Sequence, residues 1–117
     1  MTKRPHNITG AITTVAGNGT CGYSGDGGLP ASAELCFPQD VVLNSGNVYI
    51  ADTGNVVIRK VSGSLIATYA GTGAYGYNGD GLAALSTNLD DPVALVQDLN
   101  GTLFELDDVQ LRLRKIH

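Results

Sequence analysis

Residues 17–27 read Gly-Asn-Gly-Thr-Cys-Gly-Tyr-Ser-Gly-Asp-Gly, and residues 71–81 read Gly-Thr-Gly-Ala-Tyr-Gly-Tyr-Asn-Gly-Asp-Gly. Seven of the eleven positions are identical at an offset of 54 residues. A match of this quality within 117 residues indicates an internal repeat. A period near 50 residues is typical of solenoids and propellers.

The repeat extends over nearly the whole chain. Residues 12–17 recur as residues 66–71 at the same offset, and Asp52 recurs as Asp107 at an offset of 55. One residue has therefore been inserted within the second unit, and we place it in the turn at residues 97–101.

Each unit predicts short β-strands. Runs rich in β-branched and aromatic residues alternate with turns of Gly, Ser, Asn and Asp. Strands are expected at residues 40–44, 47–52, 56–61, 65–70, 93–98, 102–107 and 111–116, with a further one at 11–16. No segment has a convincing helical period. Four antiparallel strands per unit, joined through one long glycine loop, is the sequence form of a β-propeller blade.

The expected domain organisation follows from these strands. We expect an all-β fold with an N-terminal extension at residues 1–10 and two propeller blades within residues 11–117. The blades are built from residues 40–70 and 93–116, and the strand at residues 11–16 completes a blade.

Two segments resemble a known family. Residues 49–61, Tyr-Ile-Ala-Asp-Thr-Gly-Asn-Val-Val-Ile-Arg-Lys-Val, resemble the core of an NHL repeat. The loop Gly-Tyr-Ser-Gly-Asp-Gly-Gly at residues 22–28 resembles the long-loop variety found in extracellular and cell-surface propellers such as teneurins. The resemblance implies four-stranded blades, usually six around a channel. Gln110 stands where the pattern has Asn, so a looser turn or a different surface is expected in the second unit.

The resemblance also implies that the long loop and the Asp-x-x-Asn turn share one rim, which could bind a protein or carbohydrate. The expected rim contacts are Tyr23, Asp26, Asp52, Asn55, Tyr77, Asp80 and Asp107. The alternatives for Asp26 and Asp80 are a Ca²⁺ ligand or a cap on N–H groups of their own turns. We favour the cap, because each loop contains one Asp rather than alternating oxygen ligands. Asp52 and Asp107 also have the sequence positions of turn caps.

Composition argues against several functions. The net charge of −4 and a pI near 4.8 disfavour nucleic-acid binding, which needs a basic face. The only histidines are His6 and His117, so no metal or catalytic constellation is expected. Residues 17–22 match G-x-G-x-x-G, but the helix that a dinucleotide site needs does not follow, so no cofactor is expected. No membrane span or signal peptide is visible, which predicts a soluble chain. The sequence does not indicate the cellular compartment.

Two cysteines lie outside the repeat pattern, and two arginines are part of it. Cys21 and Cys36 could form a disulfide or remain two partly buried thiols. Arg59 and Arg114, each followed by Lys, are expected on outer strands, where charges discourage strand addition.

Assembly is expected from the blade pattern. Two blades alone leave apolar faces in water, and repeat proteins need several units to close a core. We expect residues 11–16 of one chain to complete the last blade of its neighbour, giving a cyclic trimer of six blades. The alternative is a two-blade excerpt of a longer propeller.

The expected function is a non-enzymatic interaction or scaffold module, with the chain itself as a partner. The alternative is part of a six-bladed hydrolase or lyase with a metal over the channel. We expect no enzyme, because the innermost strands offer Gln39, Asp40, Gln97 and Asp98 but no histidine.

Overall fold

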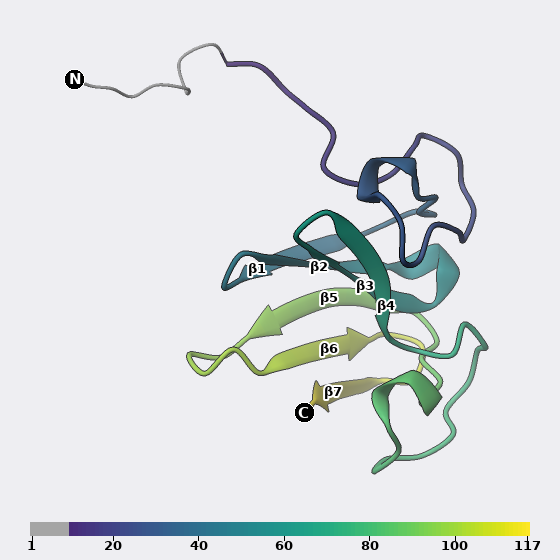
Figure 1. Cartoon of the computed structure of the whole chain (residues 1–117). Helices are drawn as coiled ribbons and strands as arrows, with labels where there is room; N and C mark the ends of the chain where they lie inside the picture. Colours follow the sequence, from purple (N-terminus) through teal and green to yellow (C-terminus); the bar gives the residue numbers. More distant parts are fainter. Residues whose placement is uncertain (1–9) are drawn as a thin grey trace.

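A computed structural model describes residues 10–117, so most of the expected N-terminal extension lies outside the described residues. This part of the chain forms two antiparallel sheets, ordered β1-β2-β3-β4 and β5-β6-β7 (Figure 1). The strands are β1 (Asp40–Asn44), β2 (Asn47–Asp52), β3 (Val57–Ser62), β4 (Leu65–Ala70), β5 (Pro92–Gln97), β6 (Leu103–Asp107) and β7 (Arg112–Ile116). Helical segments in residues 10–117 are single 3-10 turns, η2 (Pro30–Ser32), η3 (Thr53–Asn55) and η4 (Ala84–Ser86). The expected all-β, blade-like fold is confirmed, and no ring closes within residues 10–117.

The strands β3 and β7 begin one residue later than the sequence suggests. Val56 and Leu111, which are repeat equivalents, have φ angles of 62° and 58°. A left-handed backbone is costly for a bulky residue and persists only where the surrounding structure enforces it. The β-branched side chain of Val56 favours a strand, but the preceding 3-10 turn requires the left-handed conformation.

The inserted residue lies in the expected turn. Asn44 pairs with Asn47 around a two-residue turn in the first unit, whereas Gln97 pairs with Leu103 across residues 98–102 in the second. In that longer turn the Asp98 carboxylate accepts hydrogen bonds from two backbone N–H groups. The register of the strands is thereby preserved on both sides of the insertion.

One apolar core joins the two sheets, which lie one over the other in Figure 1. Its buried members are Tyr49, Ala51, Val56, Ile58, Ala70, Leu89, Leu95 and Leu103. Polar contacts fix the same interface: the Leu95 N–H donates to Asp40 Oδ2 at 2.7 Å, and Thr53 Oγ1 donates to the Pro92 carbonyl at 2.5 Å. The two units therefore form one folded body rather than two separate modules.

A second apolar cluster encloses strand β4 in the first unit. Ile66 of β4 is fully buried together with Ala33, Ile50 and Val61. The long loop closes over it, since the Gly27 N–H donates to the Ile66 carbonyl at 2.7 Å and the Ile66 N–H donates to the Gly28 carbonyl at 3.1 Å. The long loop is thus part of the blade, as its repetition suggests.

The expected strand at residues 11–16 is not formed within the single chain. This segment belongs to neither sheet, and the purple trace in Figure 1 extends away from both. Its repeat equivalent β4 pairs with β3 of the sheet that precedes its loop. The described residues contain no sheet ahead of the first loop, so the strand pairing that β4 makes with β3 has no equivalent here.

We predict that two equivalent glycines differ in their sensitivity to alanine. Gly25 and Gly79 have φ angles of 96° and 111°, where any L side chain is strained. A Cβ on Gly25 would also meet the Cβ of Ala33 at 2.6 Å, whereas a Cβ on Gly79 meets open space. Gly79→Ala should cost about 1 kcal/mol of unfolding free energy and Gly25→Ala clearly more. Urea unfolding would measure both, and equal losses would contradict this account of the loop.

Candidate functional site

A buried arginine organises the first unit. The Arg59 side chain in β3 is 0% exposed. Its Nη1 donates to Asp52 Oδ2 at 3.1 Å and to the Glu34 carbonyl at 3.0 Å. Its Nη2 donates to Asp26 Oδ1 at 3.0 Å and to the Ser24 carbonyl at 2.9 Å. One guanidinium therefore ties the sheet to two separate segments of the long loop, at residues 24–26 and at Glu34. The expectation of an outer-strand charge is wrong for Arg59, because β3 lies inside the four-stranded sheet.

The expected rim residues of the first unit converge on this arginine. Asn55 Nδ2 donates to Asp52 Oδ2 at 2.8 Å, and Asp52 Oδ1 also accepts the Cys36 N–H at 2.8 Å. The Tyr23 ring centroid lies 4.9 Å from Cζ of Arg59. Asp52 is fully buried, which corrects its placement as a rim contact and agrees with a capping role.

The second unit repeats this arrangement with a changed partner. Arg114 Nη2 donates to Asp80 Oδ1 at 3.0 Å, but its Nη1 donates to Gln110 Oε1 at 2.9 Å. The buried Asp107 carboxylate instead accepts backbone N–H groups of Asp90, Asp91 and Gln110. Asp107 therefore stabilises the backbone and is corrected as a rim contact. The sequence predicts a looser turn or a different surface at Gln110, whereas the structure places Gln110 in the interior as a partner of Arg114.

The loop aspartates do not act mainly on their own turns. Asp26 and Asp80 form ion pairs with the arginines of β3 and β7, which corrects their expected role as local caps. Asp26 is also bonded by the Thr68 hydroxyl of β4 at 2.6 Å, whereas the Asp80 side chain is 74% exposed. Tyr77 remains partly exposed beside the Arg114 guanidinium.

Cys21 and Cys36 form a disulfide within the first unit. The bond joins the start of the long loop to its end, close to the Asp52 carboxylate that binds Cys36. A disulfide that closes a loop of this size contributes about 3 kcal/mol.

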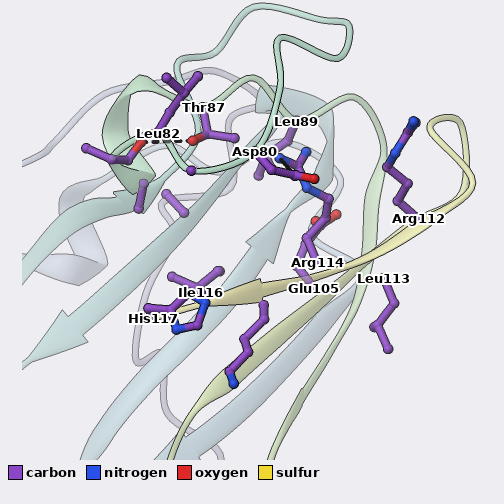
Figure 2. Close-up of a pocket in the computed structure, with 15 residues that line it drawn as sticks. Asp80, Leu82, Thr87, Leu89, Glu105, Arg112, Leu113, Arg114, Ile116 and His117 are labelled. Carbon is purple, nitrogen blue, oxygen red and sulfur yellow. Dashed lines mark hydrogen bonds and ion pairs between the residues drawn. The ribbon is translucent and has the colours of Figure 1, made fainter.

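Strand β7 is the open edge of the second sheet, and a cavity of about 660 Å³ lies beside it. We call this the β7 cavity and define it by the lining residues Gly81, Leu82, Thr87, Glu105 and Ile116. Figure 2 shows Leu82, Thr87 and Ile116 among the lining side chains, with Arg114 beside Glu105 and Asp80 beside Arg114. The equivalent space in the first unit is filled by β4.

Glu105 is the unusual residue of the β7 cavity. It stands where the first unit has Ile50, it is 0% exposed, and neither carboxylate oxygen has a hydrogen-bond partner within the described structure. Burial raises the pKa of Glu105 from 4.5 to about 8, the negative charge of Asp107 raises it further, and Arg114 opposes both. Glu105 is therefore largely neutral at pH 7.

Sequence reasoning missed both Glu105 and Arg59. The signal for Glu105 was present, since a carboxylate replaces an aliphatic residue at an equivalent position of the repeat. For Arg59 the sequence suggested an exposed charge, and only the position of β3 in the sheet shows otherwise.

Comparison with known families decides the repeat type. The profile described as NHL repeat matches residues 35–56, which span the end of the long loop, β1, β2 and the turn η3. The chain carries an NHL repeat. The second NHL-type unit follows from the internal repeat and its matching sheet. In residues 10–117, no helix is long and apolar enough to cross a bilayer, and no group of three or more His, Cys, Asp or Glu is arranged to hold a metal.

Two solved structures from Bacteroides thetaiotaomicron are similar to this chain. One, described as a candidate phosphatase, has a TM-score of 0.68 and 25% identity over 87% of this chain and 25% of its own. The other, described as an auxiliary nutrient-binding protein, has a TM-score of 0.68 and 27% identity over 88% of this chain and 28% of its own. The NHL-type chain thus spans about a quarter of each. No curated protein shows a significant match.

We predict that Glu105 makes folding depend on pH. Its pKa is higher in the folded state, about 8, than its ordinary value of 4.5. The stabilising contribution of the neutral form is therefore complete below pH 4.5 and is lost as the pH rises through 8. The unfolding free energy of Glu105→Gln, measured by urea titration, should exceed that of the parent chain increasingly across this range. A constant difference between the two chains would contradict the prediction.

We also predict unequal roles for the two arginines. Arg59→Met leaves the buried Asp52 carboxylate without its cation and should cost about 3–5 kcal/mol. Arg114→Met breaks a pair with the exposed Asp80 and should cost less. Thermal and urea unfolding of both variants provide the measurement, and an equal or larger loss for Arg114→Met would refute the ranking.

Proposed function

We propose that this NHL-type chain is a non-enzymatic interaction module that accepts a β-strand along β7 and assembles with copies of itself. A propeller fold of NHL repeats suggests a protein-interaction module. The observation that carries the finer proposal is the β7 cavity, because it occupies the position that β4 fills in the first unit.

The occupant is identified by the repeat. Residues 12, 14 and 16 are Ile, Thr and Ala, identical to residues 66, 68 and 70 of β4. Alternate residues of a strand face the same side, so the face that β4 turns toward the loop is conserved in residues 12–16. A second copy therefore offers a segment with the same three side chains on this face, and that segment could fill the β7 cavity as β4 fills the equivalent space in the first unit.

The local geometry of the first loop agrees with this occupant. The Gly17 N–H donates to the Pro30 carbonyl at 3.0 Å, and the equivalent Gly71 N–H donates to the Ala84 carbonyl at 3.0 Å. Residues 12–16 therefore enter their loop with the same hydrogen bond that follows β4. Ile12 is 97% exposed in the single chain, so its apolar surface is available to a partner.

Strand exchange of this kind is heterologous, because each copy donates at one end and accepts at the other. Three copies would close a cyclic trimer of six blades, the number that the family resemblance implies. A rim ligand, either protein or carbohydrate, would then meet the exposed loop residues Tyr23, Tyr77 and Asp80. Asp26 contributes less surface there, because Arg59 and Thr68 already bind its carboxylate.

The competing proposal is part of a six-bladed hydrolase or lyase with a metal over the channel. The description of one similar structure as a candidate phosphatase belongs to a chain of which only a quarter is matched. Strand addition is favoured, since an open edge, a cavity beside it and a segment whose sequence matches β4 all occur within this NHL-type chain.

We predict that the assembly depends on Ile12. Light scattering should give a mass near three times the 12.1 kDa of one chain. Ile12→Asp should yield monomers, because a second carboxylate buried beside Glu105 is strongly disfavoured, and the exposure of Ile12 means that the fold itself is unaffected. Leu99→Asp, which alters another fully exposed apolar residue in the turn at 98–102, is the matched control and should still assemble.

A stable monomer of the parent chain, or an Ile12→Asp variant of unchanged mass, would contradict strand exchange. Deletion of residues 1–15 provides an independent check and should also abolish the assembly.

A further inference from the structure

The β7 cavity, which is proposed to receive the exchanged strand, differs chemically from the space that Ile66 of β4 fills in the first unit. Ile66 of β4 packs against Ile50, Ala33 and Val61. The equivalents of these three residues are Glu105, Thr87 and Ile116, which all line the β7 cavity. An aliphatic strand residue therefore meets a carboxyl group in the second unit.

We infer that seating of Ile12 from a second copy requires Glu105 to be neutral, so that strand exchange takes up a proton and is reversed when Glu105 ionises. This inference rests on the proposed strand exchange, and it adds a control by pH. Both Glu105 oxygens are already buried in the single chain, but the β7 cavity lies beside them. Ile12 would fill that cavity with hydrocarbon, so that water could no longer move in to hydrate the carboxylate when it ionises. An ionised carboxylate without a partner is strongly disfavoured in such surroundings, whereas a neutral carboxyl group is tolerated.

Among the described residues, no neighbouring cation or amide satisfies the Glu105 carboxylate, and its interaction with Asp107 favours the neutral form. The Thr87 hydroxyl already donates to the Ala83 carbonyl at 2.8 Å. Arg114 is engaged by Asp80 and Gln110, as described above. The remaining charged or titratable groups nearby are Asp107 on the same strand and Arg112, Lys115 and His117 at the cavity wall. The charge of Asp107 disfavours ionisation of Glu105, which reinforces the effect of burial.

The direction of the pH dependence follows from proton linkage. In the single chain the pKa of Glu105 is about 8, and the arriving strand raises it further by filling the adjacent cavity, from which water could otherwise hydrate the ionised form. The docked state therefore binds the proton more tightly than the free chain. Affinity is greatest below pH 8 and falls about tenfold for each pH unit above it, until the docked carboxyl group itself ionises.

The test compares the association constants of the parent chain and Glu105→Gln from about pH 6.5 to pH 10 by sedimentation equilibrium. Gln has nearly the shape of neutral Glu and retains every other titratable group, so the difference between the two profiles belongs to Glu105. The parent should lose about tenfold in affinity per interface, and so about a thousandfold in the trimerisation constant, for each pH unit above pH 8, and Glu105→Gln should lose much less. Glu105→Ile restores the residue of the first unit and should assemble at every pH.

The outcomes separate this inference from the proposed function. Assembly with the same pH profile in both chains would overturn the proton link and leave strand exchange intact. No assembly at any pH would overturn both. A ¹³C NMR titration of the Glu105 carboxyl group in the parent assembly and in monomeric Ile12→Asp tests the link without altering Glu105. A higher pKa in the assembly supports the inference, and an equal or lower one overturns it.

Discussion

The first blade depends on the buried guanidinium of Arg59. A planar group with five N–H donors can satisfy carboxylates and carbonyls in several directions at once. Arg59 uses this capacity to hold Asp52 at the end of β2 and Asp26 in the long loop. A glycine-rich loop has few side chains of its own to bury, so its conformation depends on such anchors. The disulfide between Cys21 and Cys36 secures the same loop covalently.

The second blade has the same arrangement of strands and arginine as the first, with different residues at two interior positions. Gln110 stands where the first unit has Asn55, and Arg114 donates to Gln110 and Asp80 rather than to Asp107. Asp107 keeps its backbone donors but adds an uncompensated negative charge next to the inward position held by Glu105. The second NHL-type unit therefore retains the shape of a blade while its interior becomes more polar. Since the shape comes mainly from the strands and turns, it survives this change.

The open edge of strand β7 is the feature of the second sheet that bears most directly on function. An edge strand presents unpaired backbone groups, and proteins usually cover or charge such edges. Here the loop and the strand leave a cavity beside the edge instead of filling it. The first blade supplies a complete example, within the same chain, of how such a space is filled by Ile66 and its neighbours. This internal comparison gives the proposed strand exchange its residue-level detail.

The sequence by itself determined the repeat, all seven strands to within a residue or so, the place of the insertion and the exchange of Asn for Gln at residue 110. These features are local: alternation, β-branched runs and turn residues act over a few neighbouring positions. Only the tertiary structure decided that Arg59 is buried, that Asp52 and Asp107 face inward, and that residues 11–16 join neither sheet. Burial and strand pairing depend on which faces meet, and contacts between residues distant in sequence determine that. The same reason applies to Glu105, whose unusual pKa arises from the packing of the β7 cavity rather than from its neighbours along the chain.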